Sequence, residues 1–128
     1  MSKPKIVAIY RVKNEARFIE QSIKSVVDLC SEIIVLDDNS TDNTVEICSS
    51  FDKVIDIIKQ KDLPLDETRD RNYLFEKARK LDPDFILSVD GDEIFMPDAS
   101  EMLFEELFTI HPDSDVFEFQ FLTLWDNV

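Results

Sequence analysis

The sequence has almost no glycine, since Gly91 is the only one among its 128 residues. Phosphate-binding loops of the P-loop type and dinucleotide-binding fingerprints each need several glycines, so both are excluded. Cationic side chains are also scarce, with 14 Lys and Arg against 28 Asp and Glu and a formal net charge of -14. Such a chain repels a phosphate backbone, which argues against a nucleic-acid binder. A phosphate-bearing ligand would need a metal ion or a few local cations.

Cysteines and long apolar runs are scarce as well. The only two cysteines, Cys30 and Cys48, make no disulfide framework and lie among apolar residues of expected helices. We expect buried free thiols in a reducing compartment. No apolar run approaches the roughly 20 residues that span a bilayer, and the N-terminal residues lack the pattern of a signal peptide. We therefore expect a cytoplasmic protein without a membrane span.

Short apolar runs alternate with amphipathic segments along the chain. Strand-forming residues predict five strands, at residues 6–10, 33–36, 54–58, 85–89 and 116–124. Helical periodicity predicts four helices, at residues 15–30, 41–50, 67–81 and 99–109. Alternating apolar strands and helices predict an α/β fold, with a mainly parallel sheet covered by helices on both faces. We expect residues 1–128 to form a single domain.

Polar clusters follow three of the predicted strands, at residues 11–15, 37–42 and 90–93. Ligands of open parallel sheets bind beyond the carboxyl ends of the strands, where the strand order reverses. We therefore expect the three clusters to form one site.

The cluster Asp90-Gly91-Asp92-Glu93 carries three carboxylates in four residues. A hard cation such as Mg²⁺ or Mn²⁺ would relieve their repulsion, and such ions commonly use one or two carboxylates together with substrate phosphates. Glycine at this one position suggests a close backbone approach or an unusual dihedral angle. The alternative is an ordinary acidic turn, since Asp-Gly is common turn chemistry.

The cluster after the second strand begins with a tandem aspartate, Asp37-Asp38. We expect one of Asn39, Ser40 or Thr41 to cap the following helix. Capping does not account for the aspartates, and a carboxylate at a strand end can accept a hydrogen bond from a base imide or a ribose hydroxyl. Asp38 is therefore a candidate ligand-binding residue.

Arginines open the helix expected at residues 67–81, at Arg69 and Arg71. Cations in the first turn oppose the helix macrodipole unless an anion lies close by. That anion can be a ligand of Arg71, or it can be one of the neighbouring carboxylates Asp66, Glu67 and Asp70.

With these residues in view, the chain resembles the family-two glycosyltransferases of the GT-A fold. The match covers nearly the whole chain and is carried by four segments, residues 7–15, 32–44, 71–72 and 90–92. The resemblance implies a Rossmann-like GT-A domain. It also implies a metal-dependent transfer of a sugar from a nucleoside-diphosphate donor, by family default a UDP-sugar, to an acceptor that is a glycan, a protein or a small molecule.

The resemblance also implies roles for individual residues. Asp38 and Arg71 would approach the nucleotide base, and Asp90 would face the ribose and metal-bound water. Asp92 would ligate Mn²⁺ or Mg²⁺, with Asp90 beside it. The remaining nucleotide-pocket positions are Arg11, Asn14 and Glu15.

The sequence departs from the family pattern in two places. Residues 65–68 replace the glycine and small residues that precede the Arg-Asn pair in many relatives, so the base contact can differ. The general base of relatives lies in a later acceptor-binding half, so no base is assigned and we expect an incomplete GT-A domain. We expect the strand at residues 116–124 to be covered by further chain or by a partner, such as a second copy.

Two other functions compete with this interpretation. One is a nucleotide-sugar-binding module, or a truncated fragment, without turnover of its own. The other is a nucleotidyltransferase on the same fold, which the absence of a glycine-rich loop near the N-terminus disfavours.

Overall fold

The computed structural model describes residues 4–61, 63–98 and 101. Strands and helices alternate along this part of the chain as β1 (Ile6–Val12), α1 (Ile19–Val26), β2 (Glu32–Asp38), α2 (Thr44–Ser49), β3 (Val54–Gln60), α3 (Glu67–Arg79) and β4 (Phe85–Asp90). The first four predicted strands and first three predicted helices are confirmed, although α1 is shorter than expected. The helix expected at 99–109, apart from residue 101, and the strand expected at 116–124 lie outside the described residues.

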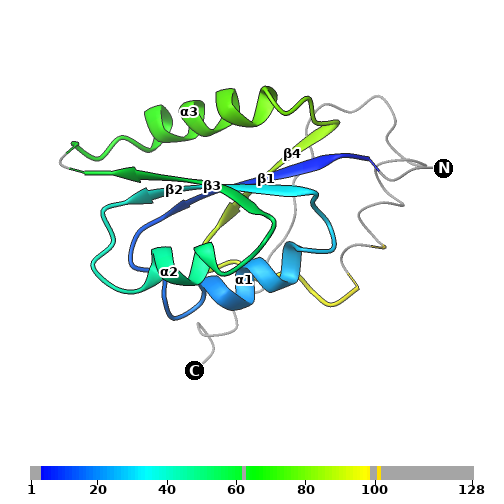
Figure 1. Cartoon of the computed structure of the whole chain (residues 1–128), viewed down its shortest axis with the longest axis horizontal. Helices are drawn as coiled ribbons and strands as arrows, with labels where there is room; N and C mark the ends of the chain where they lie inside the picture. The colour runs from blue at the N-terminus through cyan, green and yellow to red at the C-terminus, as the bar shows by residue number, and fades with distance from the viewer. Residues whose placement is uncertain (1–3, 62, 99–100, 102–128) are drawn as a thin grey trace.

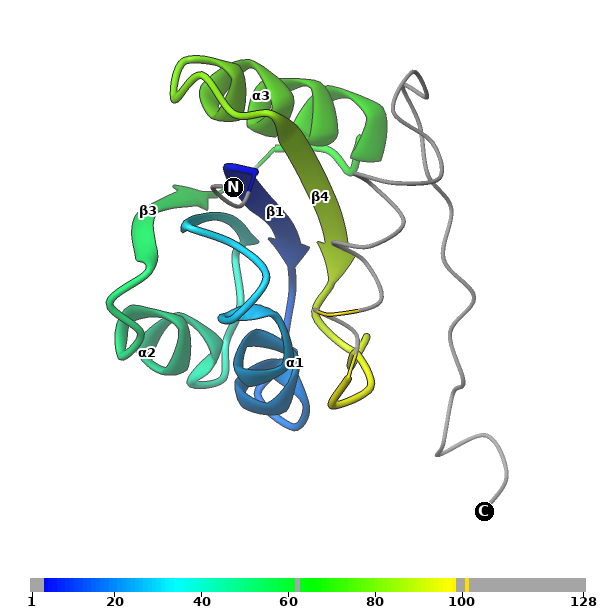
Figure 2. The ribbon, with the colours of Figure 1, turned by 90° about the vertical axis from the view of Figure 1, so that its right-hand side faces the viewer.

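The described strands form one parallel sheet in the order β3-β2-β1-β4. Helices α1 and α2 cover one face and α3 covers the other, as Figures 1 and 2 show. The chain moves from β1 to β2 to β3 in one direction and then returns through α3 to place β4 on the far side of β1. The predicted α/β class is therefore confirmed, and the strand order reverses between β1 and β4.

The core has one layer on each face of the sheet. Alternate residues of β1 face opposite ways, so Ala8 and Tyr10 join the layer under α1 and α2 while Val7 and Ile9 join the layer under α3. Burial on both faces explains why the strands are continuous apolar runs rather than alternating ones.

Helix α3 contacts the sheet through a narrow stripe. Leu74 and Ala78 are fully buried, and Leu81 packs against the same layer from just beyond the helix. The apolar residues of the helix expected at 67–81 predict that Phe75 also points inward, but this is wrong, because Phe75 is 37% exposed. One residue is about 100° of rotation on a helix of about 3.6 residues per turn, which carries Phe75 off the buried stripe.

Both cysteines are buried free thiols, as expected. Burial raises the pKa of Cys30 to about 11 and that of Cys48 to about 12, so both are protonated at neutral pH. Cys48 lies in α2, but the expected helical position of Cys30 is wrong because α1 ends at Val26.

No helix among the described residues is long and apolar enough to cross a membrane.

Candidate functional site

The strand ends bring the polar clusters to one edge of the sheet. Arg11 of β1 is in register with Leu36 of β2 on one side and with Asp90 of β4 on the other. Asp38 of β2 is in register with Gln60 of β3. Parallel strands end at the same edge, which lies at the left of the sheet in Figure 1.

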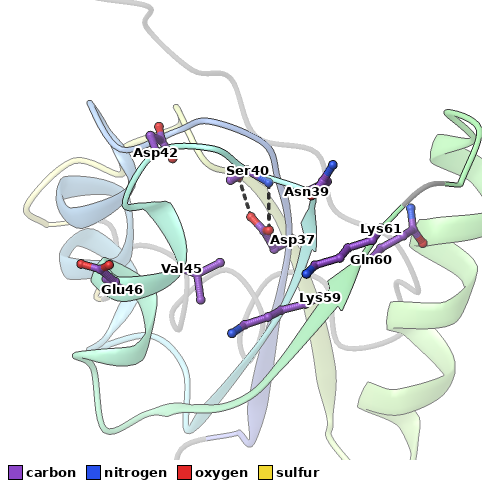
Figure 3. A pocket seen from close by; sticks show the side chains of 9 residues that line it. All are labelled: Asp37, Asn39, Ser40, Asp42, Val45, Glu46, Lys59, Gln60 and Lys61. Carbon is purple, nitrogen blue, oxygen red and sulfur yellow. Dashed lines mark hydrogen bonds between the residues drawn. The ribbon is translucent and has the colours of Figure 1, made fainter.

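The tandem aspartates at the end of β2 do different things because successive side chains of a strand point to opposite faces. Asp37 Oδ1 accepts a hydrogen bond from Ser40 Oγ at 2.6 Å, and Asp37 Oδ2 accepts one from Ser40 N at 3.1 Å (Figure 3). Asp37 therefore closes the turn after β2. Asp38, on the α3 face, accepts hydrogen bonds from Arg11 Nη2 at 3.0 Å and from Gln60 Nε2 at 3.2 Å.

The cap of α2 differs from the expectation. None of Asn39, Ser40 and Thr41 caps the helix, because α2 begins at Thr44 with Asn43 at the N-cap position and no side-chain cap there. Asp42 Oδ1 instead accepts from Thr44 N at 3.0 Å. The loop is thus longer than the capping pattern indicated, and its polar groups serve turns within the loop.

A buried ionic network occupies the α3 side of the edge. Arg11 Nε donates to Asp70 Oδ2 at 2.8 Å while its Nη2 donates to Asp38. Asp70 Oδ1 accepts from Arg69 Nε at 3.2 Å and Nη2 at 3.1 Å, and Gln60 Nε2 reaches Asp70 Oδ2 at 3.3 Å. Burial alone would raise the pKa of Asp70, but the hydrogen bonds from Arg11, Arg69 and Gln60 together hold that pKa below its ordinary value.

Two members of this network, Asp70 and Gln60, were not predicted as site residues. The sequence indicated Asp70 only as a counter-charge for the arginines of the first helical turn, which is what Asp70 is for Arg69. A signal was available, because Asp70, Leu74 and Ala78 are four residues apart and so share the buried stripe of α3. A carboxylate in such a stripe requires charged partners.

Asn14 ties the loops after β1 and β2 together. Asn14 has a positive φ of 51°, and its Oδ1 accepts from Thr41 N at 2.7 Å and Asp42 N at 3.3 Å. Ser40 Oγ accepts from Asn14 N at 2.8 Å. The predicted nucleotide-pocket position is therefore one whose amide oxygen already organises the loop beside Asp38.

The Asp90–Glu93 segment forms a compact acidic turn. Asp90 N donates to Glu93 Oε1 at 2.8 Å, and Glu93 N donates to Asp90 O at 3.0 Å. The backbone of Gly91 lies close to the β1 loop, which is one of the two reasons expected for a glycine here. A Cβ at this position would lie 2.8 Å from Glu15 Cγ and 3.2 Å from Val12 Cγ1. The acidic turn is thus packed directly against the start of the β1 loop.

Arg71 contacts the acidic turn from α3. Its Nη2 lies 2.5 Å from Asp90 Oδ1, and its Nη1 donates to Ser88 Oγ at 2.6 Å. At this edge of the sheet, Arg11 therefore pairs with Asp38 and Asp70, whereas Arg71 pairs with Asp90.

The acidic turn carries donors of the kind that a divalent cation needs. Burial, followed by the charges of Asp92 and Asp90, raises the pKa of Glu15, and burial with the same two charges raises the pKa of Glu93. No cluster of three or more acidic, histidine or cysteine side chains is arranged to hold a metal ion in the described part of the chain. The donor set fits an ion held by one or two carboxylates, with phosphate oxygens and water completing its coordination.

Two pockets flank this edge. One lies between the β2 loop, α2 and the end of β3 and is lined by Asp37, Ser40 and Lys59 among others (Figure 3). The other lies on the α3 side, where Leu36, Ile58 and Tyr73 surround the polar groups of Gln60 and Asp70. Neither is lined by Arg71 or Asp90, so the predicted nucleotide residues span an open edge rather than one of these pockets.

The chain is similar to known proteins in sequence and in fold. The chain is 30% identical over 96 residues to the poly-beta-1,6-N-acetyl-D-glucosamine synthase of Staphylococcus epidermidis, an alignment that covers 73% of this chain and 23% of that protein. The fold matches that of S. aureus TarS in complex with UDP, with a TM-score of 0.69 and 22% identity over 84% of this chain and 33% of that one.

A second structural match is the glucosyl-3-phosphoglycerate synthase of Mycobacterium tuberculosis in complex with Mn²⁺, UDP and glucosyl-3-phosphoglycerate. Its TM-score is 0.59 and its identity 24%, over 83% of this chain and 40% of that one. These two likenesses establish a GT-A-like fold. The chain covers between 16% and 23% of the length of its curated relatives.

The family model described as glycosyl transferase family 2 matches residues 8–120, a span that includes all four described strands except the start of β1. By this match, the chain belongs to glycosyl transferase family 2.

Proposed function

We propose that this chain forms the donor-binding region of a metal-dependent glycosyltransferase that transfers a sugar from a UDP-sugar to an acceptor. The observation that carries the proposal is the division of the sheet edge into two chemically distinct parts. One is a charge-balanced network around Asp38, and the other is an acidic turn around Asp90 and Asp92.

Asp38 is the proposed contact of the nucleotide base. It lies at a strand end, its side chain is 10% exposed, and each carboxylate oxygen accepts one hydrogen bond from the described residues. A carboxylate can accept about four hydrogen bonds in all, so lone pairs remain for an N–H of the ligand. Uracil offers such an N–H, whereas the corresponding ring nitrogen of cytosine is an acceptor that a carboxylate repels.

The cations of the edge would act on either side of the nucleotide. Arg11 pairs with Asp38, and Arg71, which pairs with Asp90, would approach the base. Asn14 and Glu15 would line the pocket from the β1 loop, Asn14 by ordering the loop at residues 40–42.

The acidic turn would hold the metal ion. Asp92 makes no hydrogen bond or ion pair with any residue that the structure describes, which leaves its oxygens for a cation, and Asp90 lies beside it. Bound Mn²⁺ or Mg²⁺ would neutralise charge that develops on the departing diphosphate. Asp90 would exchange part of its pairing with Arg71 for the ribose and the hydration shell of the ion.

Thermal denaturation with UDP and MnCl₂ tests this proposal. UDP at about 100 times its Kd stabilises the folded chain by about 2.7 kcal/mol, so the melting temperature should rise. Asp92→Asn should abolish the shift. The matched control is Asp52→Asn, which removes the same charge at the opposite edge of the sheet, just before β3. The absence of a shift in the unmodified chain would refute the proposal.

A sugar-transfer assay tests whether the isolated chain turns over its donor. We assign no general base, so the isolated chain should bind UDP with Mn²⁺ and yet transfer no sugar to water or to an acceptor panel. Transfer by this chain alone would show that a base lies within it.

A further inference from the structure

The guanidinium of Arg11 is held between two carboxylates that come from different elements. Its Nε donates to Asp70 of α3 at 2.8 Å, and its Nη2 donates to Asp38 of β2 at 3.0 Å. The Arg11 side chain is only 9% exposed, so its orientation is set by these two partners rather than by solvent. Glu67 is a weak third partner, since it is 70% exposed and 3.9 Å from Arg11 Nη1.

The two carboxylates differ in what they leave available to a ligand. The side chain of Asp70 is 0% exposed and accepts four hydrogen bonds, from Arg11, Gln60 and twice from Arg69. Four is about the full capacity of a carboxylate. Asp38 accepts only two from the described residues, and its side chain is 10% exposed. Asp70 is therefore a partner of the protein alone, whereas Asp38 has acceptor capacity at the surface.

The charges of the network explain why Arg11 does not close over Asp38. Two buried carboxylates, Asp38 and Asp70, face two guanidinium groups, those of Arg11 and Arg69. Without the charge of Asp70, Arg11 would face Asp38 as its only buried anion, since Glu67 is exposed. Guanidinium and carboxylate groups readily form a two-pronged pair that uses both carboxylate oxygens. Such a pair would occupy the lone pairs that the base contact needs.

We infer that Asp70 is a positioning residue that holds the Nε edge of Arg11 and thereby keeps Asp38 open to an N–H of the nucleotide base. The inference rests on the proposed function, in which Asp38 reads the base. Gln60 supports the same arrangement, because its amide group reaches both Asp38 and Asp70. Asp70 itself contacts no part of the nucleotide.

Titration calorimetry of the full chain with UDP and with CDP, both in the presence of Mn²⁺, tests the inference. Asp70→Asn should weaken UDP binding about tenfold, the equivalent of about 1.4 kcal/mol, while CDP binding changes little. The preference for UDP over CDP should therefore fall. The matched control is Glu76→Gln, which removes the same charge from an exposed position of α3 and should leave both affinities unchanged.

A second substitution distinguishes positioning from a general structural role. In the double variant Arg11→Gln with Asp70→Asn, the Arg11 guanidinium that would close over Asp38 is gone. The preference for UDP over CDP should therefore return to within about threefold of that of the unmodified chain, whatever the loss of Arg11 costs in overall affinity, so the effects of the two substitutions on this preference should not add. If Asp70→Asn alone does not fold, the double variant is tested instead, because it buries one charge fewer of each sign. The measured quantity is then its preference for UDP over CDP.

Each outcome decides between the inference and the function on which it rests. A chain that binds UDP normally with Asp70→Asn, or a double variant whose losses merely add, contradicts the positioning role and leaves the donor site intact. An unmodified chain that binds no UDP, or that binds CDP equally well, contradicts the base contact of Asp38 and the positioning role together.

Discussion

Two neighbouring parts of the sheet edge treat the same functional group, the carboxylate, in opposite ways. Around β2 and α3, the carboxylates Asp38 and Asp70 are buried and matched by Arg11 and Arg69. Around β4, the carboxylates of residues 15, 90, 92 and 93 lie close together, and Arg71 pairs with only one of them. In the first part, the charges of the carboxylates are balanced by arginines of the protein, whereas the second part carries an excess of negative charge.

This difference in charge balance suits the two parts of the sheet edge to different tasks. Burying a charge is tolerable only when partners compensate its lost hydration, so the balanced network can be rigid and pre-formed. An excess of negative charge is tolerable only while it stays partly hydrated or gains a cation. In the proposed function, the balanced part would read a neutral base and the acidic turn would hold a metal ion under a diphosphate.

Removing the central anion of the balanced network should have the largest effect on stability. Asp70→Ala leaves Arg11 and Arg69 short of a buried partner, so we expect a loss of about 3–5 kcal/mol in the free energy of unfolding. Urea denaturation measures it. Glu76→Ala on the exposed side of α3 is the control and should stay within about 0.5 kcal/mol. Equal effects of the two would mean that the network contributes little.

Filling the close contact beneath the acidic turn should have the next largest effect. Gly91→Ala places a Cβ 2.8 Å from Glu15 Cγ, and such overpacking costs about 1–3 kcal/mol. Shortening the opposing side chain, with Glu15→Ala in the same chain, should recover much of the loss. Urea midpoints of the single and double variants measure both. A single variant as stable as the unmodified chain would show that the turn moves aside at no cost.

Acid should weaken the balanced network specifically. The folded-state pKa of Asp70 lies below its unfolded value of about 3.9, so the unfolded chain takes up the proton first as the pH falls. The stabilisation is complete well above pH 4 and is lost as the pH falls through the folded-state pKa. Urea midpoints between pH 6 and pH 3 should therefore fall more steeply for the unmodified chain than for Asp70→Asn. Parallel curves would contradict this assignment.

Relieving the charge excess of the acidic turn should have the smallest effect and the opposite sign. Glu93→Gln keeps an acceptor for Asp90 N but removes one repelling charge, so it should stabilise the metal-free chain by about 0.5 kcal/mol at low ionic strength. Because salt screens exposed charges, the gain should vanish at about 1 M NaCl. A gain that persists in high salt would point to packing rather than charge.

The fold was largely predictable because each element carries its own pattern. Apolar runs located β1 to β4 within a few residues, and helical periodicity located α1 to α3. The errors were local. Phe75 lies just off the buried stripe of α3, and the polar residues after β2 close a turn instead of capping α2. Both depend on the rotation of a helix and the length of a loop, which a pattern of residue types specifies only to within a residue or two.

The site was predictable as a location but not as a set of contacts. The strand ends told which residues would share an edge, and Arg11, Asp38, Arg71 and Asp90 all lie there. The pairing of Arg11 with Asp70 joins residues 59 positions apart, and nothing in the sequence links them. The opposite directions of Asp37 and Asp38 follow from strand geometry, but which of the two faces α3 depends on the sheet.

The sequence by itself determined the α/β alternation, the acidic character and the four family segments, because these depend on residue types and short spacings. Only the tertiary structure decided how the charges are shared. The crossover through α3 carries Asp70 back over the sheet to Arg11, while β4 carries Asp90 to the far side of Arg11. Electrostatic energy depends on distance in space, so chain topology made one group of carboxylates balanced and left the other with an excess of negative charge.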